Sequence, residues 1–236
     1  MSRIREDLHT HTLYSHGTGT PEQNVQAALS RALCAIAVSE HGPGHLFYGV
    51  RGKKLSAFKA DMLRLKAAYA DRIDVRIGLE CNLMGRGLCD LPSDYASYDV
   101  RILGFHKGVW PRDIGTARAL LEAFHIGRAD PVYLADALLC TAEKYHIHFI
   151  SHPSLYAKAD LPTLARGAAQ LGVLLEINNS HPVWNAAQLK QAAALGARFI
   201  IGSDAHKPEN VGRVDRALLL AQAAGLTAKE IVNYTE

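Results

Sequence analysis

The sequence lacks any hydrophobic run close to the roughly 20 residues that a membrane-spanning helix needs. Its polar opening residues, MSRIRED, also lack the apolar stretch of a signal peptide. These absences argue against an integral membrane protein and against a secreted one. We therefore expect a cytoplasmic protein without a membrane partner.

Cysteines are few and widely spaced. Cys34, Cys81, Cys89 and Cys140 form no CxxC pair, the spacing of many zinc sites and redox-active thiols. Disulfides are also rare in cytoplasmic proteins. The sequence therefore predicts buried thiols rather than a disulfide framework.

Dense positive charge is missing as well. The formal net charge is +3, and Lys and Arg are scattered apart from Arg51, Lys53 and Lys54. Proteins dedicated to nucleic acid carry a basic patch or stripe, so the composition argues against a nucleic-acid partner and leaves a small anionic substrate open. Hydrophobic residues make up 48% and charged residues 21%, which is typical of a globular protein and argues against disorder.

No linker, low-complexity tract or change of composition divides the 236 residues. This length is usual for one α/β barrel, and we predict a single domain over residues 1–236. Two segments are irregular: HGPGHLFYGVRGK, which is rich in glycine, and the stretch from Lys107 to Asp130, with a candidate helix at 116–124. Both follow expected strands, so we interpret them as active-site loops.

Short β-rich runs alternate with longer Ala- and Leu-rich stretches of helical spacing, which is the pattern of βα units around a parallel sheet. We expect seven strands, at residues 4–9, 34–40, 74–81, 99–106, 147–153, 172–178 and 197–206. The main helices are expected at 21–33, 54–70, 131–146, 161–172, 185–196 and 211–225. An open doubly wound sheet also fits the alternation, but no Gly-rich dinucleotide fingerprint follows the first strand. The pattern therefore favours an α/β barrel.

Residue types that bind metals gather at the carboxyl ends of these strands, where the loops of a parallel barrel converge on its axis. His9 and His11 are spaced i, i+2, so both side chains point to one face of the first strand and can bind one ion. Glu176 and Asn178, at the end of the sixth strand, are expected to bond neighbouring residues instead. The other candidate ligands are His16, His41, Glu80, His106, His152, Asp204 and His206.

Taken alone, each candidate has a simpler structural explanation. An HxH pair is common on strands, His106 and His152 fit core histidines with one hydrogen bond, and Asp204 can cap the next helix. Glu80 is different, because burying its carboxylate is costly unless it is paired or bound to a cation. The coincidence of so many candidates at strand ends favours a polynuclear metal site.

The remaining histidines divide by the rim of the barrel on which they lie. His146 and His148 stand at the start of the fifth strand, on the opposite rim, and are expected to be structural. His45, His125 and His181 lie in loops on the catalytic side, where substrate contact and a purely structural role are equally open.

The motifs DLHTH, SEHG, GLE, GFH, ISHP and GSDAH occur in this order between residues 7 and 206. With them, the chain resembles the PHP (polymerase and histidinol phosphatase) domain family. Within that family it is most similar to the stand-alone YcdX-like phosphatases, above all around ISHP, LEINN and GSDAH. The resemblance implies a distorted (β/α)7 TIM-like barrel that holds three metal ions. Its strand number agrees with the number counted from the pattern alone.

The resemblance also implies which side chains hold each ion. Glu80 would bridge the first two ions, and the third would be held by histidines alone. The implied sets are His9, His11, Glu80 and Asp204; Glu80, His106 and His152; and His16, His41 and His206. One position departs from the family pattern, because Glu40 stands before His41 where the family usually has aspartate.

Nitrogen and oxygen ligands of this kind accept zinc, manganese or iron, and zinc is our first expectation. Two ions that share Glu80 would hold a bridging hydroxide as the nucleophile. Asp204 or a ligating histidine such as His206 would move the proton, so we expect Glu80, Asp204 and His206 to be catalytic. Several polar residues follow strand ends and are candidates for contacting the phosphate of the substrate: Arg51, Arg86, Arg128, His181, Lys207 and Arg213. For most of them the alternative is a solvated side chain without such a contact.

The leading hypothesis is a metal-dependent phosphatase that acts on a small phosphorylated metabolite, with histidinol phosphate as one candidate. Phosphodiesterase or exonuclease chemistry on nucleotides is an alternative, although no basic stripe supports it. A non-catalytic, metal-stabilised module is the other alternative. Such modules often lose ligands, and this chain keeps all nine. The pattern predicts no particular oligomeric state.

Overall fold

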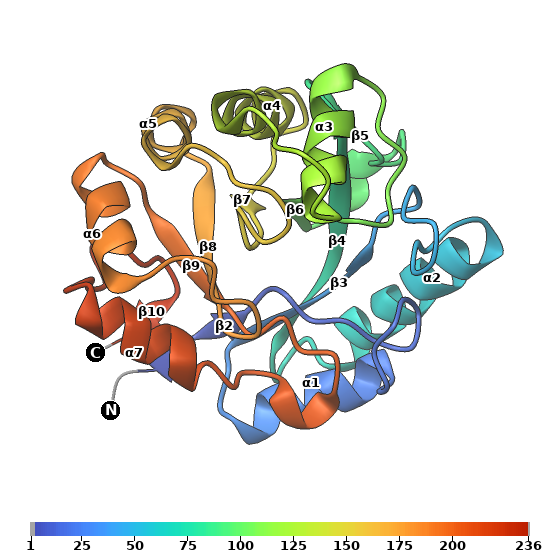
Figure 1. The fold of residues 1–236 in the computed structure, drawn as a ribbon. Coiled ribbons are helices and arrows are strands. Elements are labelled where there is room, and N and C mark those ends of the chain that lie inside the picture. The colour runs from blue at the N-terminus through green and yellow to red at the C-terminus, as the bar shows by residue number, and fades with distance from the viewer. Residues whose placement is uncertain (1–2, 236) are drawn as a thin grey trace.

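The computed structural model describes residues 3–235. Seven parallel strands curve into a nearly closed barrel with helices around its outside (Figure 1), which confirms the predicted distorted (β/α)7 fold. In hydrogen-bonded order the strands are β2 (Glu6–Asp7), β3 (Ala35–His41), β4 (Asp74–Gly85), β6 (Val100–Gly104), β7 (Phe149–Ile150), β8 (Leu174–Asn178) and β9 (Phe199–Gly202). A short strand that the sequence did not predict, β5 (Leu88–Cys89), pairs antiparallel with the end of β4.

At the carboxyl end of the barrel, the segment after β2 contacts the segment after β9, and these are the first and last strands of the sheet. Thr10 and Ala205 form an isolated parallel bridge there. The backbone N–H of His11 donates to the carbonyl of Ala205 (2.8 Å). These bonds bring the end of the first strand against the segment that carries Asp204.

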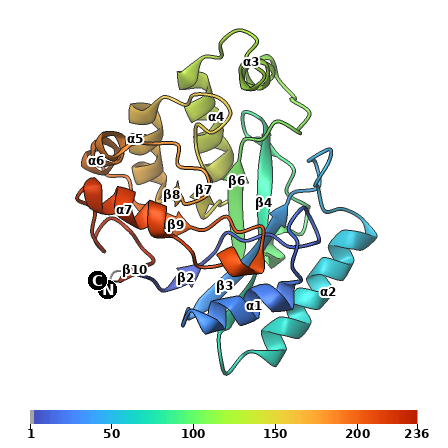
Figure 2. The ribbon, with the colours of Figure 1, turned by 60° about the horizontal axis from the view of Figure 1, so that its bottom comes forward.

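At the amino end, residues 230–233 fill the space between β2 and β9. The buried side chain of Asn233 donates to the carbonyls of Glu6 (3.0 Å) and Ile201 (2.7 Å), and its oxygen accepts from the N–H of Ile201 (3.0 Å). Just beyond it, β10 (Tyr234–Thr235) pairs antiparallel with β1 (Arg3–Ile4). Figures 1 and 2 both place β10 beside β2.

Helices cover the outside of the barrel, and local sequence signals set their ends. Thr20 and Gln23 form a capping box at the start of one helix, Asn185 and Gln188 form another, and Gly172 ends a third in the left-handed conformation (φ 70°). The helices are α1 (Pro21–Ser30), α2 (Lys53–Ala68), α3 (Ile114–Ala123), α4 (Pro131–Lys144), α5 (Leu161–Leu171), α6 (Ala186–Ala194) and α7 (Asp215–Ala223), with 3-10 turns at Tyr95–Ser97 and Pro208–Asn210. Among residues 3–235, no helix combines the length and the apolar character that crossing a bilayer requires.

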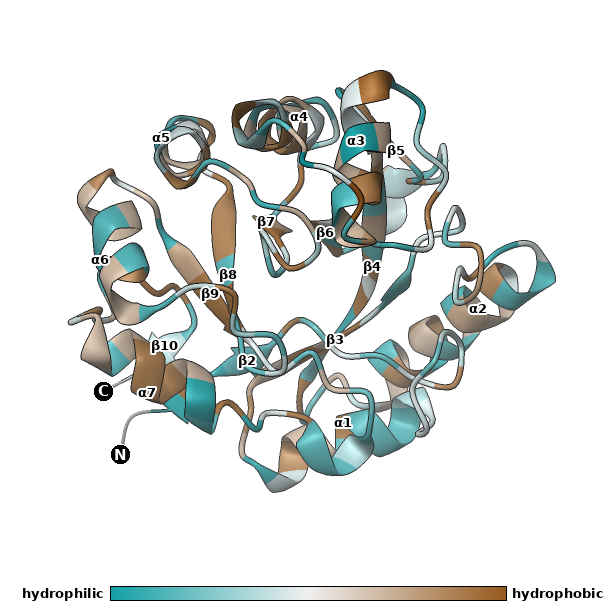
Figure 3. Ribbon diagram, in the orientation of Figure 1, coloured by the Kyte–Doolittle hydropathy of each residue, from teal (hydrophilic) through white to brown (hydrophobic). Residues whose placement is uncertain are grey.

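The hydrophobic core has two parts, because successive residues of a strand point to opposite faces. The larger part joins the outer faces of the strands to the helices, and the apolar colour along β8 and β9 marks it in Figure 3. The smaller part includes Leu8, Ala37, Ile102, Phe149 and Ile200. Its members alternate with the outward-facing strand residues and fill the inside of the barrel, so the candidate ligands rest on a packed base.

The cysteines contradict the prediction of buried thiols in part. Cys81 and Cys89 are buried, but Cys34 is exposed and Cys140 is half-buried. Cys34 precedes β3, which begins at Ala35, and therefore stands at the amino rim before the strand enters the core.

Candidate metal centre

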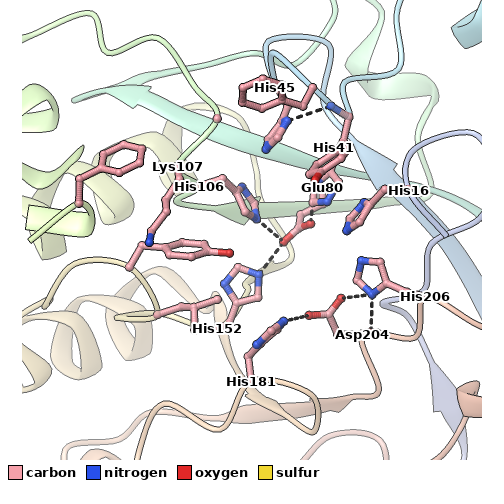
Figure 4. A pocket seen from close by; sticks show the side chains of 16 residues that line it. His16, His41, His45, Glu80, His106, Lys107, His152, His181, Asp204 and His206 are labelled. Carbon is pink, nitrogen blue, oxygen red and sulfur yellow. Dashed lines mark hydrogen bonds and ion pairs between the residues drawn. The ribbon is translucent and has the colours of Figure 1, made fainter. Parts of the chain in front are cut away.

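A cavity of about 290 Å³ opens at the carboxyl end of the barrel (Figure 4). Loops after β3, β6, β7, β8 and β9 all contribute to its wall, as a parallel barrel requires. His9 and His11 are completely buried against Glu80 and Asp204. The polar side chains that line the cavity itself are His16, His41, His45, Tyr48, Glu80, His106, Lys107, His152, Tyr156, His181, Asp204 and His206.

Glu80, on β4, lies at the centre of the cluster. Its Oε1 is 3.3 Å from His106 Nε2 and 3.0 Å from His152 Nε2. Its Oε2 faces a second group, at 3.0 Å from His41 Nδ1, 3.4 Å from His9 Nε2 and 3.6 Å from His11 Nε2. A carboxylate that bridges two ions directs one oxygen at each ion, and the two oxygens of Glu80 face two groups of histidines in this way.

Asp204 is the second carboxylate of the cluster. Its Oδ1 lies 3.4 Å from His11 Nε2, 3.6 Å from His9 Nε2 and 3.6 Å from His206 Nδ1. Its Oδ2 faces His181 Nε2 at 3.8 Å. Asp204 therefore connects the buried histidines of the first strand with the histidines at the cavity surface.

Many buried nitrogen and oxygen atoms of the cluster have no hydrogen-bond partner, which shows that this donor set suits metal ions. Among residues 3–235, these atoms include His9 Nε2, both ring nitrogens of His11, His41 Nδ1, Glu80 Oε2, His106 Nε2, His152 Nδ1 and His206 Nε2. An unpaired buried polar group costs about 1–3 kcal/mol, and so many together would be difficult to sustain without a ligand. Neutral imidazole and carboxylate are also the usual ligands of zinc.

Side chains that could share an ion fall into overlapping groups. The ligand atoms lie within 4.8 Å of one another in each of four sets: His11, His41 and His206; His9, His11 and Glu80; His9, His152 and Asp204; and His41, Glu80 and His106. His16 belongs to none of these sets, but its ring centroid lies 4.1 Å from that of His206 and 4.9 Å from that of His41. His41 thus approaches Glu80 as well as the histidines of the implied third site, so the three implied sites are less separate than the resemblance suggests.

The electrostatics of the cluster favour the protonation states that bind metal for Glu80, Asp204 and His11. Burial alone would raise the pKa of Glu80, but His106, His9 and His41 outweigh it and hold this pKa well below its usual range. Likewise, His9 and His11 outweigh the burial of Asp204 and hold its pKa well below the usual value. Burial and the neighbouring His41 lower the pKa of His11 well below its usual value, which keeps that imidazole neutral.

Burial would lower the pKa of His9 and of His152, but neighbouring carboxylates raise both. The main carboxylate is Glu176 at His9 and Glu80 at His152. A metal ion would therefore have to displace a proton from these two rings.

Glu176 and Asn178 bond to candidate ligands around them, in agreement with the expectation that they bond neighbouring residues. Glu176 Oε1 lies 2.7 Å from His9 Nδ1, and its Oε2 accepts the backbone N–H of His152 (3.0 Å). The Asn178 amide donates to Glu176 Oε2 (2.8 Å) and to Asp204 Oδ2 (3.1 Å). Because His9 Nδ1 is held in this way, its Nε2 faces Glu80 and Asp204.

A second orienting chain, which the sequence pattern did not predict, runs through Asp90. Asp90 is half-buried and accepts from both nitrogens of Asn82 (2.6 Å each) and from the N–H of Gly44 (2.7 Å). Asn82 Oδ1 in turn holds His106 Nδ1 at 2.7 Å. The position of Asn82, two residues after Glu80 on the same strand face, is a signal that could have revealed it. Asp90 follows the unpredicted strand β5 and has no such signal.

Glu40, which departs from the family pattern, bonds the loop that follows β2 rather than His41. It accepts from the backbone N–H of Thr12 (3.0 Å) and from the hydroxyls of Thr12 and Ser15. Its Oε2 lies 3.9 Å from His11 Nδ1. Burial raises the pKa of Glu40 to about 7, although these hydrogen bonds oppose the shift. Glu40 therefore anchors the loop between His11 and His16.

Of the residues predicted to contact phosphate, His181 lines the cavity. Arg51 donates to the carbonyl of Leu46 (3.1 Å), and Arg86 pairs with Asp136. Those that are exposed and lie outside the cavity lining are Arg128, Lys207 and Arg213.

The histidines that are not candidate ligands lie at different distances from the cavity lining. His45 lines the cavity, but His125 does not. His148 accepts from the N–H of Arg101 (3.0 Å) just before β7, which fits the structural role expected for it.

A family model described as PHP domain matches residues 7–228. Among curated proteins, a probable phosphatase of Shewanella sp. (strain ANA-3) is 30% identical over 246 residues, which cover 96% of this chain and 86% of that protein. A probable phosphatase of Syntrophotalea carbinolica is 30% identical over 243 residues, which cover 97% and 91% of the two chains.

Two solved structures share the fold. The histidinol phosphate phosphatase of Lactococcus lactis, crystallised with zinc, L-histidinol and phosphate, superposes with a TM-score of 0.64 at 19% identity and covers 95% of both chains. The putative histidinol phosphatase of Listeria monocytogenes gives a TM-score of 0.62 at 16% identity, over 88% of this chain and 97% of that one. At these identities the similarity concerns the fold alone.

Proposed function

This chain belongs to the PHP domain family, and from that premise we propose that it is a metal-dependent phosphatase that hydrolyses a small phosphomonoester. The observation that carries the proposal is the convergence of unpartnered histidine nitrogens on Glu80 at the floor of the cavity. Relatives named probable phosphatases support it. Histidinol phosphate is one natural candidate substrate, because a structural neighbour is named for it.

We assign the ligands of three divalent ions, with zinc first and manganese or iron as alternatives. The proposed sets are His9, His11, Glu80 and Asp204; Glu80, His106 and His152; and His16, His41 and His206. When bound, such ions activate a water molecule near neutral pH and neutralise charge on the phosphoryl group.

The side chains of the chain itself would position the substrate and move protons. Asp204 Oδ1 lies 3.6 Å from His206 Nδ1, so these groups can accept and pass on the proton of the attacking water. His181, close to Asp204 Oδ2, faces the cavity and can donate a hydrogen bond to a phosphate oxygen. Arg51, Arg128, Lys207 and Arg213 remain proposed phosphate contacts that would have to reach in from outside the cavity lining.

The size of the cavity favours a small ester over a polynucleotide. About 290 Å³ lies near the lower end of the range for small-molecule sites. A monoester also leaves more phosphate oxygens free to meet the cluster than a diester does. We therefore expect monoester hydrolysis to exceed diester hydrolysis.

The test compares 4-nitrophenyl phosphate, bis(4-nitrophenyl) phosphate and a single-stranded oligonucleotide with metal-reconstituted protein. We expect up to three ions per chain by mass spectrometry and faster turnover of the monoester. Glu80→Ala should lose activity and two ions, whereas Glu143→Ala, at an exposed position of α4, should resemble the wild type. Faster cleavage of the diester or the oligonucleotide would support the nuclease alternative. Full metal loading without turnover would support the non-catalytic module, and fewer than about one ion per chain would contradict the trinuclear centre.

A further inference from the structure

The outer wall of the cavity differs from its floor. Phe47, Tyr48, Phe124, Leu155 and Tyr156 form an apolar, mostly aromatic wall there. Phe47 is 77% exposed and Phe124 is 53% exposed, so both rings present a large face to solvent. Several exposed aromatic rings beside a polar cluster are typical of a site that binds a flat apolar group.

A single lysine stands among these rings. Lys107 Nζ lies 5.5 Å from the ring centroid of Phe124 and 5.4 Å from that of Tyr156, within the range of a cation–π contact. Figure 4 shows Lys107 next to His106 on the wall of the cavity. Lys59 and Lys66 pair with Asp94 and Asp99. Within residues 3–235, Lys107 forms no ion pair, and what sets it apart from other unpaired lysines is its place in the cavity lining.

The described lining of the cavity has no carboxylate outside the proposed metal centre. Of its described residues, the only carboxylates are Glu80 and Asp204, and both belong to the proposed metal centre. A positively charged substituent on the leaving group would therefore meet the Lys107 ammonium without a carboxylate to offset the repulsion. A negatively charged substituent would find in Lys107 a cation that lacks a partner.

We propose that the substrate of this site is the phosphate ester of an aromatic alcohol that carries a second anionic group, with the ring against Phe124 and Tyr156 and the anion at Lys107. The inference rests on the proposed phosphatase function and names the leaving group that it acts on. It also makes cationic amino-alcohol phosphates such as histidinol phosphate poor substrates, even though a structural neighbour carries that compound's name.

The test uses benzyl phosphates whose para substituent is a carboxylate, a phosphonate, a methyl or an aminomethyl group. The benzylic methylene keeps the reactivity of the leaving alcohols similar. We expect kcat/KM to be highest for the two anionic esters and lowest for the aminomethyl ester. The order of the carboxylate and the phosphonate then indicates which anion the site prefers.

Lys107→Gln should lower kcat/KM for the anionic esters by about three- to fivefold, the upper part of the range for an ion pair that faces solvent. It should leave the methyl ester unchanged within about twofold, and Lys107→Glu should make the aminomethyl ester the best of the series. The matched control is Lys190→Gln, at an exposed position of α6 away from the cavity. An equal loss for all esters in Lys107→Gln, or a wild-type enzyme that prefers the aminomethyl ester, would overturn the proposal.

Phe124→Ala tests the ring contact. We expect it to lower kcat/KM for the benzyl esters by about fivefold, since burying part of an aromatic face contributes on the order of 1 kcal/mol, and to leave propyl phosphate unchanged. Leu121→Ala is the control, because Leu121 is 46% exposed on α3 and does not line the cavity. Equal losses for benzyl and propyl esters would exclude a specific ring contact.

Binding of non-hydrolysable analogues separates the phosphatase proposal from the proposal about the leaving group. In these analogues a C–P bond replaces the ester link, and the para substituents are the same. If the analogues bind in the expected order but no ester is turned over, the phosphatase function fails and the preference for an anionic aromatic group stands. If esters are turned over without that order, the phosphatase function stands and this inference fails.

Discussion

Two residues of the proposed metal centre have backbone conformations that L-amino acids rarely adopt. His152 has φ 26° and Asp204 has φ 52°. Such conformations cost about 1–3 kcal/mol each and persist only where the surroundings hold them. At His152 the backbone N–H is held by Glu176. In both cases the unusual turn lies at the end of a strand and directs the side chain into the cluster.

Removing His16 tests whether the third ion is separable. His16 lies at the exposed edge of the cluster, and burial together with His206 and His41 lowers its pKa to about 3, so its ring is neutral at pH 7. We expect His16→Ala to retain about two ions, because Glu80 and its partners are untouched, and to show a raised KM and a lowered kcat. Metal analysis and steady-state kinetics measure this. Leu13→Ala, an exposed position nearby, is the control. Three ions and a wild-type rate would refute the role of His16.

Asp90→Asn tests the chain that orients His106. An asparagine would direct amide protons towards Asn82 or Gly44, which already donate, and the loss of such orienting partners typically weakens metal binding by about 10–100-fold. We expect a loss of this size in a chelator competition, with unchanged circular dichroism. Asp94→Asn, which affects an exposed ion pair, should bind metal normally. Equal affinities in both variants would show that Asp90 does not act through His106.

At this scale, the sequence revealed the candidate ligands better than their supports. His9, His11 and Glu80 can be recognised as candidates because so many residue types that bind metal coincide at the strand ends. Ser151, which donates to Glu80 Oε1 (2.7 Å), and Asp90 looked like ordinary polar residues. Their function depends on partners that only the folded chain brings near, so local spacing could not identify them.

Among the elements, α3 offers a test of capping and of pH dependence together. Asp113 accepts from the N–H of Thr116 (2.7 Å), the hydroxyl of Tyr133 (2.5 Å) and the N–H of Arg86 (2.8 Å), and so joins α3 to α4 and to the end of β4. Asp113→Ala should lower the free energy of unfolding by about 1–2 kcal/mol in urea denaturation at pH 7. Asp71→Ala, at an exposed position, should change it by less than about 0.5 kcal/mol.

The same variant has a defined pH dependence. Burial would raise the pKa of Asp113, but its hydrogen bonds outweigh burial and lower it. A carboxyl group whose folded pKa is depressed stabilises the fold above its unfolded pKa of about 3.9 and loses that contribution as the pH falls through the folded pKa. The difference between wild type and Asp113→Ala should therefore shrink between pH 7 and pH 3. A difference that stays constant or grows on acidification would contradict the assignment.

Helices were predicted more accurately than strands. Caps and prolines mark helix ends locally, and the predicted helix at 131–146 is found at 131–144. The predicted strands at 4–9 and 147–153 shorten to two residues each, at 6–7 and 149–150. Beyond Asp7 and Ile150 the backbone no longer pairs with the neighbouring strands, and His9, His11 and His152 follow. The sequence pattern typical of a strand therefore extends further than the strand pairing does.

For the whole molecule, closure of the barrel depends on Asn233. Asn233→Ala would leave the carbonyls of Glu6 and Ile201 and the N–H of Ile201 without their partner in a buried place. We expect a loss of about 3 kcal/mol in the free energy of unfolding, measured in urea. Asn210→Ala, at an exposed position, is the control. If both variants unfold at the same urea concentration, the amide does not contribute to closure.

The alternation of strands and helices predicted a parallel sheet, since each βα unit must bury its apolar strand against its neighbours, and the missing Gly-rich fingerprint favoured a barrel over an open doubly wound sheet. The pattern did not predict the part of residues 230–233 in closing it. That segment has only isolated contacts with β2 and β9 and no alternating run of its own. Its role depends on the gap that the other strands leave, which is a property of the assembled sheet.

The order in which a ribosome makes the chain gives this closing segment a further consequence. Residues 230–233 follow every barrel strand in the sequence, so the facing edges of β2 and β9 stay without the segment between them while the rest of the barrel is translated. Open strand edges can pair with other chains. A nascent chain stalled before Asn233 should therefore engage chaperones or aggregate more readily than one that has passed it.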